Sequence, residues 1–168
     1  MLETIKYVMN QNVVAGIVLV MIMCGIINDP KQLTGNVNKT DLQNLSGAME
    51  IENGNYGGNE DNDMDRLLLT GSVILNRLKS KKWNGSTIEE VILAKDGGYI
   101  QYASVTRKGF KTKKASKRTK LLAKYLLIYG SVCPENVVYQ GQGKQKGTLY
   151  KAIPVKGDKD ELFYTGTY

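Results

Sequence analysis

The segment GAMEIENGN, residues 47–55, places two glutamates two positions apart, and these are the first side chains to consider for acid–base chemistry. The chain has 168 residues and no histidine, which excludes nucleophile systems of the Cys-His and Ser-His-Asp kinds. Its two cysteines, Cys24 and Cys133, lie far apart in the sequence, so we expect neither a disulfide framework nor a zinc site. Carboxylates, tyrosines, lysines and amides remain as reactive groups, and no cofactor or metal is expected.

The apolar residues around the two glutamates predict a helix over about 40–53, with Thr40 or Asp41 as its N-cap and its end at Asn53. One stripe of this helix consists of Leu42, Leu45, Met49 and Glu52. Glu50 falls on the other side, where we expect it to be in solvent. A carboxyl group at the edge of an apolar stripe loses hydration, which raises its pKa. Glu52 is therefore the predicted acid.

The rest of the chain predicts a helical core followed by a small sheet. Helices are predicted at 63–79, 87–93 and about 116–129, and β-forming segments at 136–142, 147–153 and 161–166. Gly71, in the middle of the longest helix, indicates close packing there, and a capping box at 86–89 opens the second helix. The acidic segment 56–63 suits a helix start better than a calcium loop. Segment 99–105 is compatible with either a strand or a loop, and the fold class is α+β with a C-terminal antiparallel sheet.

An apolar run without charges, VVAGIVLVMIMCGII, occupies residues 13–27. It is shorter than the roughly 20 residues that span a bilayer. We expect residues 1–28 to form an apolar helix that acts as a signal peptide or signal anchor, followed by a linker at 29–39 and one domain at 40–168. This predicts an exported or membrane-anchored protein. A buried helix of a soluble fold is the alternative.

Positive charge is concentrated between Arg107 and Lys124, where nine Lys or Arg residues occur without any Asp or Glu. This stretch predicts contact with a polyanion, such as an anionic wall polymer or a membrane surface. Phe110 is the only aromatic residue near its middle, which disfavours single-stranded nucleic acid. The alternative is a solvated helix face with Leu121, Leu122 and Leu126 packed inside.

Four segments in order resemble one family of enzymes. GSVILNR at 71–77 is similar to the signature helix of the SleB/CwlJ-type cell wall hydrolases, which include spore-cortex-lytic enzymes and phage endolysin relatives. EIENGN at 50–55 stands where that family has a glutamate segment of the form Tyr-x-Glu-Ala, so Glu52 falls on the family's glutamate. Gln101 and Tyr102 are similar to its GQF or GQY, and NVVYQ at 136–140 begins a set of terminal strands like those of the family. The resemblance covers roughly residues 42–164.

The resemblance implies a lysozyme-like domain, related to lytic transglycosylases, that lies on the cell-wall side of the membrane and cleaves the glycan of peptidoglycan. Glu52 would be the catalytic acid. Because we find no convincing second carboxylate among Glu60, Asp61 and Asp63, we expect a single-acid mechanism in which a sugar hydroxyl closes an anhydro ring. The residues expected to bind substrate or shape the cleft are Asn76, Arg77, Gln101, Tyr102, Tyr139 and Gln140.

One departure from the family pattern supports an alternative function. Glu50 stands where the family usually has tyrosine, two positions before the catalytic glutamate. With the basic stretch, this change is compatible with a catalytically inactive relative that binds cell wall or another polyanion, including nucleic acid. The two hypotheses differ in whether soluble products are released from peptidoglycan.

Overall fold

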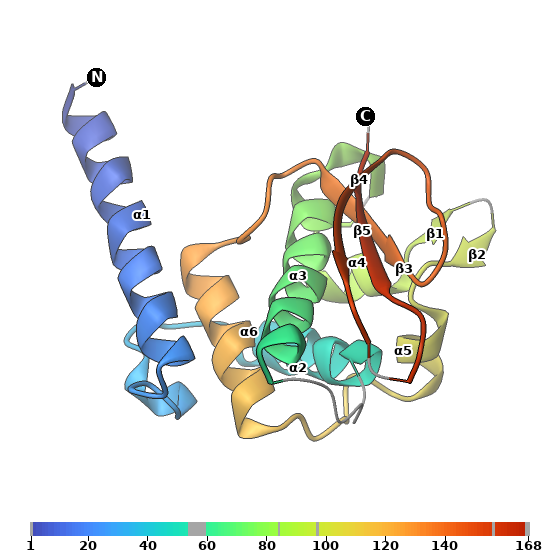
Figure 1. Ribbon diagram of the computed structural model, residues 1–168, viewed down its shortest axis with the longest axis horizontal. Helices are drawn as coiled ribbons and strands as arrows, with labels where there is room; N and C mark the ends of the chain where they lie inside the picture. Colours follow the sequence, from blue (N-terminus) through green and yellow to red (C-terminus); the bar gives the residue numbers. More distant parts are fainter. Residues whose placement is uncertain (1, 54–59, 84, 97, 156, 167–168) are drawn as a thin grey trace.

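The computed structural model describes residues 2–53, 60–83, 85–96, 98–155 and 157–166 (Figure 1). Its elements in chain order are α1 (Leu2–Met23), η1 (Pro30–Gln32), α2 (Lys39–Asn53), α3 (Glu60–Lys79), η2 (Lys81–Trp83), α4 (Ile88–Leu93), β1 (Lys95–Asp96), β2 (Tyr99–Ile100), α5 (Ala103–Arg107), α6 (Lys117–Tyr129), β3 (Val137–Gly141), β4 (Thr148–Ile153) and β5 (Glu161–Thr165). The predicted α+β class, with a helical core and a small C-terminal antiparallel sheet, is confirmed.

The centre of the molecule is formed by α2, α3 and α6, which pack against one another through fully buried side chains. Leu45 and Met49 come from α2, Ile74 from α3, and Leu122 and Leu126 from α6. At Gly71 of α3, an added Cβ would lie 2.4 Å from Leu126 Cδ1 and 2.9 Å from Met49 Sδ. The predicted close packing at this glycine is therefore confirmed.

The starts of α2 and α3 differ from the sequence prediction. Asn38, not Thr40 or Asp41, caps α2, because its Oδ1 accepts the backbone N–H groups of Thr40 (2.8 Å) and Asp41 (3.2 Å). Helix α3 begins at Glu60 and not at residue 63, so the acidic residues Glu60, Asp61 and Asp63 lie at the start of a helix, as the interpretation of segment 56–63 expected. Residues 56–59 of that segment lie outside the described residues.

The capping box of α4 is shifted by one residue from its predicted position. Thr87, whose backbone is extended, is the N-cap and accepts the N–H of Glu90, while the Glu90 carboxylate accepts the Thr87 N–H. Ser86, the predicted cap, donates both its N–H and its hydroxyl to Glu90. The α6 prediction is confirmed, with Ser116 as N-cap and Gly130 closing the helix at φ +91°.

The C-terminal strands form an antiparallel sheet in the order β3-β5-β4. The last strand lies in the middle and pairs with both others, with Gly141 opposite Leu162 on one side and Ile153 opposite Glu161 on the other. One face of the sheet packs on α3 through Phe163 and Val73. The segment at 99–105 contains both β2, which pairs with β1, and the start of α5.

Helix α1 lies at one edge of the molecule and packs on α6 (Figure 1). Val18, Leu19 and Ile22 make this contact, and the backbone carbonyl of Ala15 accepts a hydrogen bond from the Tyr125 hydroxyl at 3.1 Å. Within the described part of the chain, none of the helices is both long and apolar enough to cross a membrane.

The expected linker at 29–39 packs against the same helix, α6. Lys124 Nζ donates hydrogen bonds to the carbonyl oxygens of Pro30, at 3.0 Å, and Leu33, at 2.7 Å. Leu33 is itself buried in the main core. These contacts hold the end of α1 close to α6.

Candidate active site

A cavity of about 300 Å³ lies where α2, α3 and α5 meet the sheet, and we call it the carboxylate pocket. Its lining consists of Ile51, Glu52, Arg66, Ser104, Lys108, Gly141, Gln142 and Glu161. Six of these eight residues have polar or charged side chains, and Gly141 contributes only backbone. Such a lining suits a hydrated, polar ligand better than an apolar one.

Glu52 reaches the pocket from the last turn of α2, beside the buried Ile51. The Ser104 hydroxyl, on α5, donates a hydrogen bond to Glu52 Oε1 at 2.7 Å. Burial raises the pKa of the Glu52 carboxyl, against the lowering effects of the Ser104 hydrogen bond and of the Lys108 and Arg77 charges. The predicted direction of this pKa shift, and its cause, are therefore confirmed.

Glu161 is a second carboxylate in the same pocket, and the sequence analysis missed it. It is half-buried at the first position of β5. Burial raises its pKa to about 7, and the charges of Glu52 and Asp158 add to the rise while Arg66 opposes it. Nothing in the segment ELFYT marks its first residue as a site residue, because only the packing of β5 near α2 brings it to Glu52.

Burial raises the pKa of both carboxyl groups, so each can hold a proton closer to neutral pH than a solvated glutamate does. Hydrogen bonding and nearby cations limit the rise at Glu52, whereas the charge of Glu52 adds to the rise at Glu161. Two interacting carboxyls of this kind titrate as a pair and hold one proton between them over a range of pH. A pair with one proton can donate it to a leaving oxygen while the other carboxylate accepts a proton from water.

Two cations border the carboxyl pair. Arg66 of α3 is buried, and its Nη2 donates to the carbonyl oxygen of Asn53 at 3.3 Å. Lys108 follows α5 and is exposed at the pocket. On the opposite side Gln142 Nε2 donates to Asp158 Oδ2 at 2.8 Å, which fixes the loop after β3. The cations and the amide are positioned to bind anionic or hydroxyl groups of a ligand.

Asn76 and Arg77, two of the predicted site residues, join α3 to the sheet and do not line the pocket. Asn76 Nδ2 donates to the carbonyl oxygens of Pro134 (2.8 Å) and Val137 (3.0 Å). Arg77 Nε donates to the carbonyl of Val138 at 2.6 Å. The charge of Arg77 nevertheless lowers the pKa of Glu52. Both side chains position β3, and Arg77 also contributes to the electrostatics of the pocket.

Tyr102 is buried behind the pocket without lining it. The Arg77 guanidinium carbon lies 4.9 Å from the centre of its ring. Burial raises the pKa of Tyr102 to about 12, and the charges of Glu52 and Glu161 contribute to the rise. Among the described residues, none forms a hydrogen bond with its hydroxyl. Tyr102 thus lies within the electrostatic range of both carboxyls.

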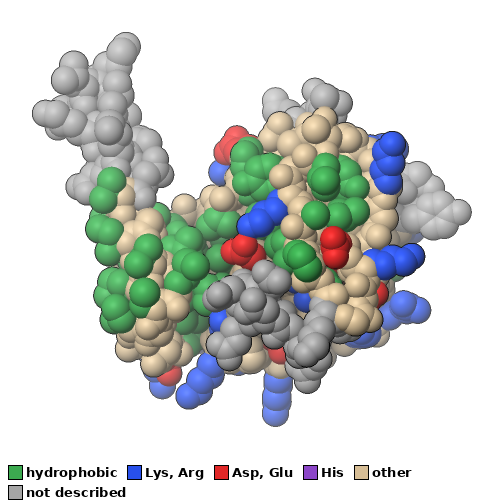
Figure 2. Space-filling view, viewed as in Figure 1, with side chains coloured by type: hydrophobic (Ala, Val, Ile, Leu, Met, Phe, Trp, Pro, Cys, Tyr) green, Lys and Arg blue, Asp and Glu red, His purple; other side chains and the backbone are tan. Residues whose placement is uncertain are grey.

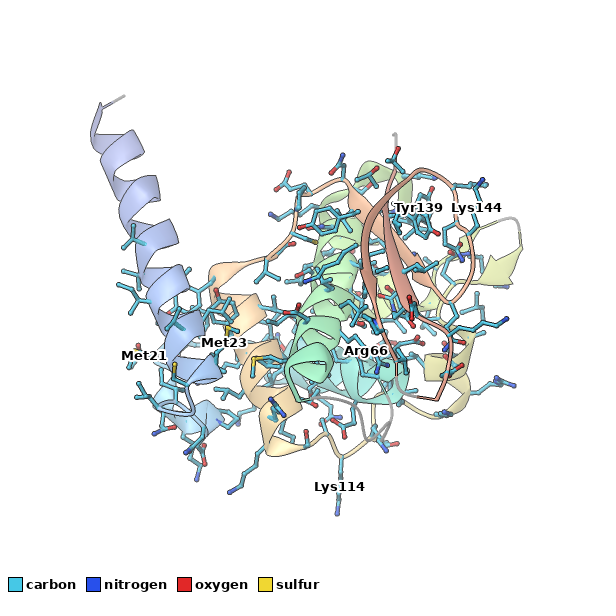
Figure 3. All side chains as sticks on the ribbon, viewed as in Figure 1. Met21, Met23, Arg66, Lys114, Tyr139 and Lys144 are labelled. Atoms are coloured by element: carbon cyan, nitrogen blue, oxygen red, sulfur yellow. The ribbon has the colours of Figure 1, made fainter. Side chains whose placement is uncertain are left out.

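The other three predicted residues lie outside the pocket lining. Gln101 donates its backbone N–H to the carbonyl of Ala94. The Tyr139 hydroxyl accepts a hydrogen bond from Lys82 Nζ at 2.6 Å, and Gln140 precedes the pocket residue Gly141. In Figure 3, Tyr139 lies near one end of the sheet and Arg66 near the other. The structure therefore separates Tyr139 from the carboxyl pair.

Comparison of the chain with protein-family models, with curated proteins and with solved structures finds no match. In the described residues, no three Cys, Asp or Glu side chains come together as a metal site would require. The chemistry of the pocket is therefore inferred from its own side chains.

Proposed function

We propose that this protein cleaves the glycan strands of peptidoglycan in the carboxylate pocket. The observation that carries the proposal is the presence of Glu52 and Glu161, two half-buried carboxyls with raised pKa values, in one polar cavity. Glycosidic cleavage requires a carboxylic acid that is still protonated near neutral pH. The substrate class comes from the resemblance of segments 50–55 and 71–77 to SleB/CwlJ-type hydrolases, and a lysozyme-like architecture belongs to the same proposal.

In the proposed reaction, Glu52 acts as the acid. Its proton passes to the bridging oxygen, and the bond between that oxygen and the anomeric carbon breaks with both electrons leaving on the oxygen. Positive charge then develops on the sugar ring, next to the carboxylate of Glu161. Lys108 and Gln142 bind substituents of the sugar at the edge of the pocket.

Glu161 changes the expectation about the second half of the reaction. A single-acid mechanism was expected because no second carboxylate was evident, and Glu161 removes that reason. As a base, Glu161 would take a proton from the water that attacks the anomeric carbon, which leaves a reducing end. If Glu161 does not act as a base, a sugar hydroxyl gives up its proton to Glu52 and closes an anhydro ring. The second half of the reaction thus depends on Glu161.

Digestion of purified sacculi tests the proposal, with soluble products identified by mass spectrometry. We expect Glu52→Gln to lower product release at least 100-fold, because an amide cannot supply the proton. Glu135→Gln, at an exposed carboxylate that pairs with Lys79, is the matched control and should keep full activity. Equal release by the wild type and Glu52→Gln would reject Glu52 as the acid.

The variant Glu161→Gln distinguishes the two outcomes of the reaction. If products with reducing ends disappear in this variant, we would conclude that the carboxyl pair catalyses hydrolysis. If products with anhydro ends persist, we would conclude that Glu52 alone catalyses transglycosylation. Release of free peptide instead of glycan fragments would contradict glycan cleavage altogether.

Binding without cleavage is a second candidate function, favoured by the exposure of the basic stretch. Its exposed members are Arg107, Lys108, Lys111, Lys113, Lys114 and Lys117. Such a surface binds polyanions in a salt-dependent way. Salt-sensitive retention on sacculi without any soluble product would favour this candidate over the enzyme.

A further inference from the structure

The outer face of α1 is apolar and uncovered. Val13, Ile17, Val20 and Met23 are 55–59% exposed, and Ile26 just beyond the helix is 61% exposed. The opposite face of the same helix packs on α6. A helix that is hydrophobic on both faces is normally covered all round, by protein or by lipid. Over residues 13–23, the part of α1 whose side chains the structure describes, only one face is covered.

A second pocket, of about 360 Å³, lies at the C-terminal end of α1, and we call it the α1 pocket. Ile22 and Met23 line it from α1, and Leu121 lines it from α6. Lys117 and Arg118, in the first turn of α6, also line it. The α1 pocket therefore combines apolar walls with cationic side chains, which is the chemistry that binds an anionic amphiphile.

Further lysines precede the pocket residue Lys117 along the chain. Lys113, Lys114 and Lys117 are exposed in the segment that leads into α6, and Lys114 projects from that end of the molecule in Figure 3. Glu50 approaches α6 from α2, but its carboxylate is used to accept the Ser116 N–H and the Thr119 hydroxyl. The lysine side chains are thus the groups that meet an external anion.

The apolar and basic surfaces are continuous. Figure 2 shows hydrophobic side chains covering the lower part of α1 and the neighbouring surface towards α6, with Lys and Arg side chains projecting from the edge below. A helix with an apolar face and nearby cations lies at a membrane interface, where the face enters the acyl region and the cations meet anionic headgroups.

We propose that the outer face of α1 and the α1 pocket together bind the surface of a bilayer that contains anionic lipids. A second copy of the chain would also cover the apolar face, but it would bring two lysine clusters together. An anionic bilayer supplies the complementary charge and covers the apolar residues at the same time. This inference is independent of the carboxylate pocket.

Vesicle co-sedimentation of the full chain tests the inference. We expect binding to phosphatidylcholine vesicles that contain phosphatidylglycerol, and much weaker binding to phosphatidylcholine alone. Ile17→Asn should weaken binding about tenfold, because it places an amide in the apolar face. Lys117→Gln should weaken it about fivefold, and added salt should reproduce that loss.

Two matched variants serve as controls. Leu149→Asn changes an apolar side chain of similar exposure on β4, and Lys144→Gln removes a lysine on the far side of the molecule (Figure 3). Both should bind vesicles as the wild type does. Equal binding to the two kinds of vesicle, or unchanged binding by Ile17→Asn, would overturn the inference. So would concentration-dependent dimerisation that Ile17→Asn abolishes in the absence of vesicles.

Discussion

Glu50, Glu52 and Glu161 are the same kind of side chain in three different environments. Glu52 has a hydroxyl donor and nearby cations, whereas Glu161 has Glu52 itself as a neighbour. Glu50 is half-buried and accepts hydrogen bonds at the start of α6, so the prediction that it would be solvated is wrong. Neighbouring groups, and not residue type, distinguish the carboxylate of Glu50, which accepts hydrogen bonds, from the two carboxyls with raised pKa values.

The pH dependence of stability provides a prediction at the residue scale. The pKa of Glu161 is raised from 4.5 to about 7 in the folded chain. A carboxyl with a raised pKa stabilises the fold most below its unfolded pKa, and that contribution is lost as pH rises towards its folded pKa. Glu161→Gln removes this loss of stability at higher pH, because an amide does not ionise. We therefore expect the variant to gain stability relative to the wild type between pH 4.5 and pH 8.

Chemical unfolding of the wild type and Glu161→Gln at the two pH values measures this difference. One pKa unit corresponds to about 1.4 kcal/mol, and solvent screening of the half-buried Glu161 reduces the effect, so we expect a relative gain of about 1–2 kcal/mol. Asp65→Asn, at an exposed carboxylate that pairs with Lys151, is a suitable control and should show no comparable gain. A stability difference that stays constant with pH would mean that Glu161 ionises normally in the fold.

The residues that sequence analysis could identify are those whose environment is local. Glu52 was identifiable because the three apolar residues that share its stripe precede it within one helix. Glu161 was not, because its partner lies more than a hundred positions earlier in the chain. The same limit explains Glu50, whose acceptor role depends on Ser116 and Thr119 of a distant helix. Long-range pairing of polar groups leaves no periodic pattern in the sequence.

At the scale of elements, the packing of α2 against its neighbours depends on two glycines. Gly71 of α3 lies against Leu126 and Met49, and Gly47 of α2 lies against the Phe110 backbone, where an added Cβ would be 2.1 Å from the carbonyl oxygen. These contacts keep the last turn of α2 beside α5, which carries Ser104. The position of Glu52 is therefore set by helix packing.

Gly71→Ala tests this dependence. Alanine favours a helix by about 1 kcal/mol over glycine, but here its Cβ would displace Leu126 and Met49. Overpacking of a core typically costs about 1–3 kcal/mol, so we expect net destabilisation in thermal or chemical unfolding. Gly16→Ala in α1, where no atom lies within 4 Å of the added Cβ, should be neutral or stabilising. Equal effects of the two substitutions would contradict a tight crossing at Gly71.

Periodicity predicted the longer helices and the three C-terminal strands, but not β1 or α5, which carries Ser104, and not the arrangement of the elements. The segments that form β3, β4 and β5 were all predicted, yet the order β3-β5-β4 follows from how the chain packs on α3. That order brings Glu161 and Gly141 to the carboxylate pocket together. The presence of Glu161 in the candidate site could therefore be inferred only once the strand order was known.

At the scale of the whole molecule, the basic stretch connects two separate surfaces. Lys108, near its beginning, lines the carboxylate pocket, and Lys117 lines the α1 pocket. Helix α1 stands at one edge of the molecule, while the sheet that carries Glu161 lies beyond α3 (Figure 1). A protein that binds an anionic bilayer through α1 would therefore keep its carboxylate pocket away from the lipid and open to a polymer nearby.

This separation predicts that the two proposed activities, glycan cleavage and bilayer binding, are independent. Ile17→Asn should lose vesicle binding and still release products from soluble glycan fragments at the wild-type rate, because residue 17 touches no part of the carboxylate pocket. Glu52→Gln should lose product release and still bind vesicles. When both variants are assayed in both experiments, each should lose one activity and keep the other. A general loss of folding would remove both activities. If Ile17→Asn lost both activities while its unfolding temperature stayed unchanged, α1 would have to act on the carboxyl pair, and the two surfaces would form one functional unit.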